Sequence, residues 1–105
     1  MVTRLYTHSI YLEHLTPPGH PERPDRLRAI ERVLEDERFA ALDRRQSPAG
    51  DEATILYAHP KSHVDKVRAA IPAEGLARID ADTSASPKSW DAALAAIGAA
   101  GAAVD

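Results

Sequence analysis

The histidines are the first residues in this chain whose type and spacing could do chemistry. There are five in 105 residues. His59 and His63 are four positions apart, which on a helix places two imidazoles on one face, as in zinc-binding helical motifs. Pro60 occupies the position where such motifs carry a general-base glutamate, and it puts His59 at or before the start of the helix. The pattern therefore favours capping or packing histidines over a zinc site.

The other histidines, His8, His14 and His20, lie in one loop without regular spacing. A chelate is one interpretation, but loops of this kind more often hold a single hydrogen-bonded histidine than three metal ligands. The chain has no cysteine, no His-His pair, no Asp-x-His triplet, no Gly-x-Ser-x-Gly elbow and no glycine-rich phosphate loop. From residue chemistry alone we predict no catalytic residues and no metal site within these 105 residues.

The segment Thr16–Leu27, TPPGHPERPDRL, concentrates prolines, a glycine, a histidine and charged residues in a stiff loop that enters a helix. Arg26 falls in the first turn of that helix, where the positive end of the helix dipole disfavours a basic side chain. This favours a specific partner such as Glu22 or a carbonyl group; a plain surface position is the alternative.

Asp80 and Asp82 alternate in a turn just before the last helix. Aspartates in such positions ordinarily serve as turn and capping residues. As an alternative, the two carboxylates could accept backbone N–H groups from a bound peptide or ligand.

The composition excludes several classes of protein. Hydrophobic residues make up 44% of the chain, but alanine is by far the commonest of them, so burial is weak against an ordering cost of roughly 1–2 kcal/mol per residue. A stand-alone fold is therefore not assured. The net charge is −3 and acids alternate with bases, without the basic stripe of a nucleic-acid partner. There is no apolar run of signal-peptide or membrane-spanning length, so we expect no membrane partner and a cytoplasmic location.

The elements that must position these residues follow from apolar spacing and proline. In chain order we expect a buried strand at Val2–Tyr6, a loop at 7–24, a helix at 24–36, a helical turn at Phe39–Leu42, a strand at Asp43–Gln46, a short helix capped by Asp51, a helix from about Pro60 to Ile71, and an irregular stretch at 76–85.

The last helix should start at Ser86-Pro87, a cap followed by proline at the first helical position. Gly98 and Gly101 cost it roughly 1 kcal/mol each relative to alanine, which a helix usually tolerates because another backbone approaches closely. The pattern carries no stop signal before residue 105. We therefore expect the chain to be a fragment of a longer protein.

Three blocks, in this order, resemble the histone deacetylase family, and most of all its bacterial deacetylase-like, acetoin-utilisation branch. They are Leu5-Tyr6 with Thr16–Ile30; Ile55–Val64, ILYAHPKSHV; and Asp80–Thr83, DADT, with Ser86-Pro87 and the Ala- and Gly-rich helix.

The resemblance implies an α/β class and the N-terminal part of a three-layer arginase/deacetylase-like fold with a mainly parallel sheet. Residues 1–105 would be the N-terminal portion of a single catalytic domain, mostly helical with one or two short strands. The family hydrolyses acetyl amides with a zinc-bound water. Its His-His pair and metal ligands have no counterpart in this sequence, so the chain would end before the zinc site, bind no zinc alone and be inactive.

The resemblance also implies roles for some residues. His20, Pro21 and Glu22 match the loop at the rim of the acyl-lysine tunnel, and Asp80 and Asp82 fall in the second rim loop. Arg26 matches an arginine that lines an internal cavity behind the zinc. The partners would be an acetylated lysine peptide or a small acetylated amine, together with the remainder of the catalytic domain. The alternatives are a small non-enzymatic helical interaction module derived from this family and a histidine-based metal binder.

Overall fold

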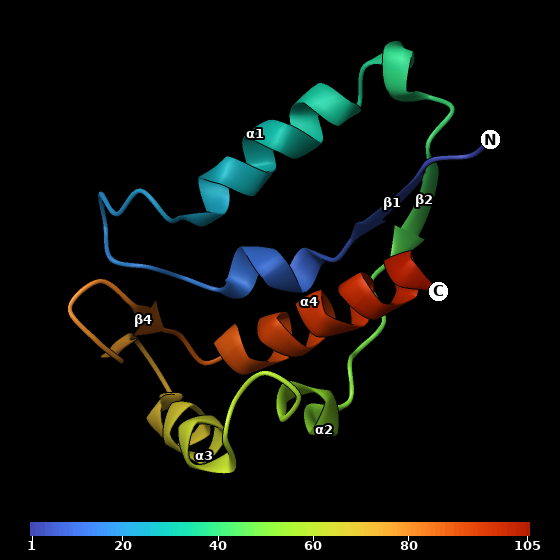
Figure 1. Cartoon of the computed structure of the whole chain (residues 1–105). Coiled ribbons are helices and arrows are strands. Elements are labelled where there is room, and N and C mark those ends of the chain that lie inside the picture. Colours follow the sequence, from blue (N-terminus) through green and yellow to red (C-terminus); the bar gives the residue numbers. More distant parts are fainter.

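Two short strands form a parallel pair. In the computed structural model, which describes residues 1–105, β1 (Arg4–Thr7) lies beside β2 (Asp43–Gln46) (Figure 1). In their register, Tyr6 is opposite Arg45. The strand predicted at Val2–Tyr6 therefore begins two residues later. Its side chains are half-buried or exposed rather than buried, because the sheet has only two strands and α4 is the helix that packs on β1. The strand predicted at Asp43–Gln46 is confirmed.

The connection between these strands contains more helix than the sequence predicted. A 3-10 helix, η1 (Ser9–Glu13), lies within the predicted loop 7–24; His8 caps it by accepting the N–H of Ile10 on Nδ1, at 2.9 Å. The loop prediction was wrong there because the prolines that restrict the backbone begin only at Pro17.

Helix α1 (Pro24–Leu34) starts with proline at its first turn, as predicted, but ends two residues before the expected residue 36. Asp36 instead adopts an extended conformation and caps η2 (Glu37–Phe39) by accepting the Arg38 N–H. This capping also moves the predicted turn at Phe39–Leu42 towards the N-terminus.

The second half of the chain begins with two helices at their predicted places. Asp51 caps α2 (Glu52–Ile55) through the N–H of Ala53, and α3 spans Lys61–Ala70. The stretch predicted as irregular at 76–85 contains an antiparallel hairpin of β3 (Ala77–Arg78) and β4 (Ser84–Ala85). Each strand has only two residues, too few for an alternating pattern to be visible in the sequence.

Helix α4 (Ser89–Val104) runs through the middle of the structure, with α1 on one side and α2 and α3 on the other (Figure 1). It starts two residues after Pro87, the predicted first helical residue, for which Ser86 was the predicted cap. Ser86 is wrong as a cap because it is fully buried, and its hydroxyl bonds Glu13 O and Leu15 N of the segment after η1.

The backbone of α4 closely approaches the segment that leaves β2. A side chain at Gly98 would overlap the carbonyl oxygen of Pro48, and the N–H of Gly50 donates to the carbonyl of Leu94 at 2.8 Å. The predicted close approach is therefore confirmed at Gly98. It is wrong at Gly101, because no atom outside the helix lies within 4 Å of a Cβ built there.

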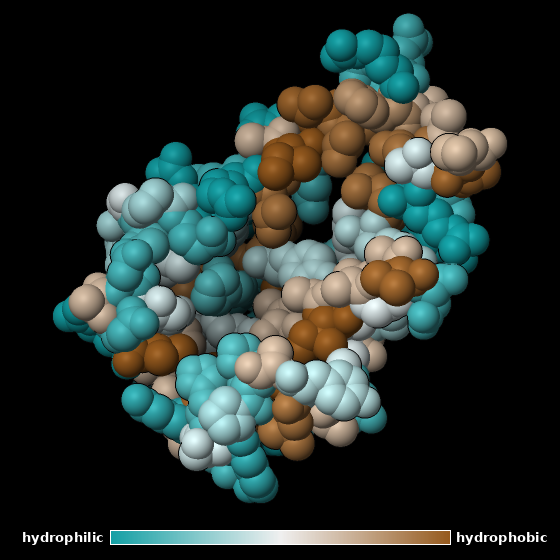
Figure 2. Space-filling model, in the orientation of Figure 1, coloured by the Kyte–Doolittle hydropathy of each residue, from teal (hydrophilic) through white to brown (hydrophobic).

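The arrangement is open, with a small core. Ala85, Ala92, Ala95, Ser47 and Ser86 are the buried residues. The accessible surface is 7477 Å², whereas a compact protein of 11.4 kDa exposes about 5,800 Å². The radius of gyration is 15.3 Å, against about 13 Å for a compact domain of this length. Figure 2 shows the result, with hydrophobic side chains gathered over α1 and a hollowed face between α1 and α4. No helix has both the length and the apolar character needed to cross a membrane.

Candidate functional site

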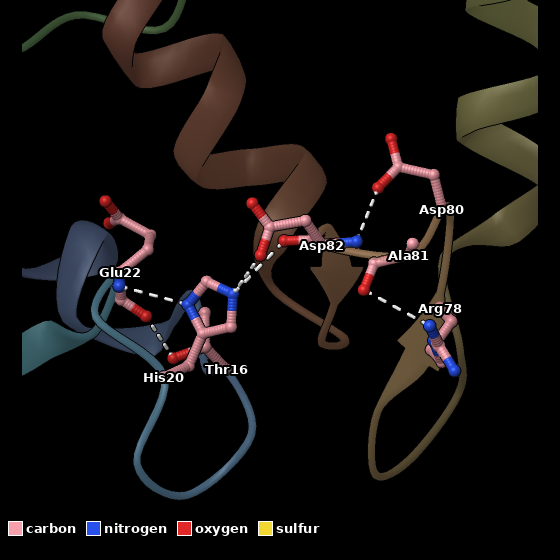
Figure 3. A network of polar contacts seen from close by, with 7 residues as sticks. All are labelled: Thr16, His20, Glu22, Arg78, Asp80, Ala81 and Asp82. Carbon is pink, nitrogen blue, oxygen red and sulfur yellow. Dashed lines mark hydrogen bonds and ion pairs between the residues drawn. The ribbon is translucent and has the colours of Figure 1, made fainter.

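Residues predicted from two distant parts of the sequence come together beside the start of α4. We call residues 16–23 the proline-rich loop and residues 79–83 the hairpin turn. A continuous series of hydrogen bonds and ion pairs runs from α1 through the proline-rich loop to the hairpin turn. Figure 3 shows the part of this series from Glu22 to Asp80. Its members are Arg26, Glu22, His20, Asp82 and Asp80. Pro21 lies within the loop between His20 and Glu22 and contributes no N–H donor.

The proline-rich loop is folded back on itself by its own polar groups. Gly19 adopts φ +82°, a left-handed conformation that glycine accepts without strain, and this lets the N–H of His20 reach Pro17 O at 3.0 Å. The Thr16 hydroxyl donates to the carbonyl of Glu22. The N–H of Glu22 donates to Nδ1 of His20 at 3.0 Å. The loop is therefore held in one shape although it is largely exposed.

Asp80 is the residue that shapes the hairpin turn. Its Oδ1 accepts the N–H of Asp82 at 2.9 Å, and Arg78 donates to Ala81 O at 3.2 Å. The Asp82 N–H, followed by a bond from the Thr83 side chain, holds the pKa of Asp80 below its ordinary value. Asp80 thus has the geometry of an ordinary turn aspartate.

The side chain of Asp82, unlike that of Asp80, leaves the hairpin turn and reaches the proline-rich loop. Nε2 of His20 lies 3.0 Å from Asp82 Oδ1 and 3.2 Å from the Asp82 carbonyl oxygen. The His20 side chain is 20% exposed and that of Asp82 is 91% exposed. Oδ2 of Asp82 has no partner within the chain and points away from His20 in Figure 3.

Arg26 has the partner that the sequence favoured. Its Nη1 lies 3.1 Å and 2.9 Å from the two carboxylate oxygens of Glu22, one turn away, and both side chains are about half exposed. A cavity of about 420 Å³ beside this pair lies between η1, α1 and α4; Glu22 and Leu27 are among its lining residues. The assignment of Arg26 to an internal cavity stays a prediction.

The remaining histidines do not assemble into a metal centre. The rings of His59 and His63 are 5.0 Å apart at their centroids, and α3 begins after His59, as Pro60 predicted. Both rings line an apolar cavity of about 500 Å³ between α2, α3, α4 and the hairpin, together with His14 and Trp90. No group of three or more His, Cys, Asp or Glu side chains is placed to hold a metal ion.

A cluster of serines that sequence reasoning missed holds the hairpin end of the site in place. Ser86 Oγ donates to Glu13 O at 2.8 Å and accepts from Leu15 N at 2.9 Å. Ser89 Oγ accepts from the N–H of Ser86 at 2.8 Å and lies 2.6 Å from Nδ1 of His14. The signal was the pair of serines three residues apart around Pro87, but the same pattern also predicts a helix cap.

Comparison with known proteins gives three similarities. The sequence model of the histone deacetylase domain matches residues 20–105. An uncharacterized protein of Synechocystis, slr0245, is 35% identical in an alignment 101 residues long that covers 92% of this chain and 33% of that protein. A crystal structure of the HDA15 HD domain superposes with a TM-score of 0.80 and 25% identity, over 94% of this chain and 30% of that one. The chain thus spans about a third of the length of these relatives, and the structural match confirms the predicted α/β fold.

Proposed function

Because the chain belongs to the histone deacetylase family, we propose that it supplies the scaffold and the pocket-rim loops of a zinc-dependent amidohydrolase. The substrate would be an acetylated lysine peptide or a small acetylated amine. The observation that carries this proposal is the family match, which begins at His20 within the proline-rich loop and continues to Asp105.

Zinc binding and the hydrolytic step would belong to polypeptide other than residues 1–105. No three potential ligands converge anywhere in these residues. The part that we assign to this chain is therefore binding and orientation of the substrate, and we derive no catalytic step from it.

We assign the rim of the pocket to His20, Pro21, Glu22, Asp80 and Asp82. We assign the acceptance of a substrate backbone N–H group to Asp82, because His20 holds its carboxylate from the proline-rich loop and its second carboxylate oxygen has no partner. Arg26 would belong to the inner side of the pocket, where Glu22 now neutralises its charge.

The open surface supports the remainder of the catalytic domain as the main partner of this chain. The accessible area exceeds that of a compact protein of the same mass by about 1,700 Å². That excess lies on this chain alone, and it is about twice the roughly 800 Å² that each partner buries in a standard protein–protein interface. Large apolar side chains such as Val33 at 57% and Val104 at 87% exposure provide surface for such packing.

The experiment compares hydrolysis of an acetyl-lysine reporter by two proteins, with zinc and without. The purified 105-residue chain should give no turnover in either condition. A chimera in which this chain replaces the matching third of the Synechocystis relative should hydrolyse the reporter only with zinc, as should the relative itself. Turnover by the isolated chain would contradict the proposal. So would a relative and a chimera that are both folded and loaded with zinc but inactive towards acetylated peptides and amines.

A further inference from the structure

We infer that His20 is a positioning residue that fixes the Asp82 carboxylate. In its Nε2–H tautomer it would join the proline-rich loop to the hairpin turn and leave one Asp82 oxygen free for an incoming N–H donor. Only the identity of that donor, a substrate backbone, rests on the proposed function. The link itself rests on contacts between residues that are 62 positions apart in the chain.

The tautomer of His20 follows from its two hydrogen bonds. The N–H of Glu22 can only donate, so Nδ1 of His20 must offer its lone pair at 3.0 Å. The proton of the neutral ring then lies on Nε2, which faces the Asp82 carboxylate oxygen at 3.0 Å. The two ring nitrogens therefore act separately, since Nδ1 orients the ring from its own loop and Nε2 holds the acid of the other loop.

Both ends of this link are held by their own backbones. On one side, the left-handed Gly19 and the bond from His20 N to Pro17 O fix the point where the imidazole leaves the loop. On the other side, Asp80 holds the N–H of Asp82. The imidazole is mostly covered, whereas the Asp82 side chain is almost fully exposed and would otherwise rotate freely in water. His20 is thus the feature that gives this exposed carboxylate a direction.

An exposed link of this kind contributes little to global stability. Its effect should be local: it should limit the mobility of the two loops and fix the orientation of Asp82. This separates a positioning role from a structural one.

Two variants distinguish the two ring nitrogens. His20→Asn keeps an oxygen near the place of Nδ1 and loses contact with Asp82; His20→Gln keeps a donor near Nε2 and loses the acceptor for Glu22.

The first experiment measures ring ¹⁵N–¹H correlations and amide hydrogen exchange in the full 105-residue chain. We expect the neutral His20 ring in the Nε2–H form, with the exposed His63 as the reference ring. His20→Gln should accelerate exchange of the Glu22 amide, His20→Asn should leave it protected, and neither should shift the thermal midpoint. A Nδ1–H ring, or equal exchange of that amide in both variants, would overturn the inference.

The second experiment measures kinetics in the zinc-loaded chimera. His20→Asn should raise KM for an acetyl-lysine peptide about fivefold, the factor expected for one lost hydrogen bond, with kcat unchanged. His20→Gln should raise it less, and KM for a small acetylated diamine without a peptide backbone should not change. If the KM for the peptide is the same in His20→Asn as in the unsubstituted chimera, the positioning role is refuted. If the NMR results hold but the chimera and the relative are both inactive, the link stands and the proposed function fails.

Discussion

Helices α4 and α1 are held in different ways. Where α4 meets the segment that leaves β2, small residues let two backbones approach: Gly98 lies against Pro48, the N–H of Gly50 donates to the carbonyl of Leu94, and Ser47 is buried. Helix α1 has no buried residue, and its ion pairs, Arg26 with Glu22 of the proline-rich loop and Arg28 with Asp25, lie on the surface. One helix is therefore fixed by close packing within the chain, while the other keeps an apolar face available for further cover.

Substitution of Gly98 should have the largest effect on this contrast. Gly98→Ala places a methyl group on the Pro48 carbonyl and should lower the free energy of unfolding by about 1–3 kcal/mol or more. The matched variant Gly101→Ala meets open space and should raise it by about 0.5–1 kcal/mol. Urea unfolding followed by Trp90 fluorescence measures both. Equal effects in the two variants would contradict the close approach.

Removal of the buried Ser86 hydroxyl, which ties the segment before α4 to the end of η1, should have the next largest effect. Ser86→Ala leaves the N–H of Leu15 and the carbonyl of Glu13 without their partner, at a cost of about 1–3 kcal/mol. The control is Ser62→Ala, on the exposed surface of α3. Thermal unfolding by circular dichroism compares the two, and an unchanged midpoint in Ser86→Ala would refute the role of this hydroxyl.

Acid should loosen the β1–β2 pair by a smaller amount. The bond from the Arg45 side chain, with added attraction from Arg4, holds the pKa of Asp43 below its ordinary value. Its contribution to stability is therefore complete above the unfolded-state pKa, about 3.8, and is lost as the pH falls through the lower folded-state value. Asp43→Asn should flatten the decline in thermal midpoint between pH 5 and pH 2 (roughly the window for a paired aspartate). The same decline in both proteins would exclude Asp43 as a source.

The smallest effect should come from the exposed face of α1. Val33→Ala removes methyl groups that are already 57% exposed and should change stability by less than about 0.5 kcal/mol. In the full-length chimera, where we expect this face to be covered, the same substitution should destabilise more. Equal effects in the short chain and the chimera would show that the face stays open.

Much of the fold could be predicted because its signals are local. Neighbouring residues predict the start of α1 at Pro24, the Asp51 cap of α2 and the Asp43–Gln46 strand, and the structure confirms all three. Ser86 carried an equally good local signal for a cap, but it was wrong because a partner more than 70 positions away uses its hydroxyl. Burial by distant segments is not visible in a local pattern.

In the candidate site, too, contacts between neighbouring residues could be predicted and contacts between distant segments could not. The stiff proline-rich loop and the pairing of Arg26 with Glu22 could be inferred from adjacent residues. The sequence did not indicate that Asp82, rather than Asp80, would meet His20, because the choice depends on a hairpin whose strands have only two residues each and leave no recognisable pattern. The roles of these residues at a pocket rim stay predictions.

The late position of α4 in the chain has a consequence during synthesis. β1 and β2 have both been made by residue 46, but the helix that packs on β1 ends at Val104. At about 5–20 residues per second, a ribosome needs roughly 3–12 s to add the residues from the end of β2 to the end of α4. For this interval the nascent strand pair lacks its cover, and chaperones near the ribosomal exit could bind it.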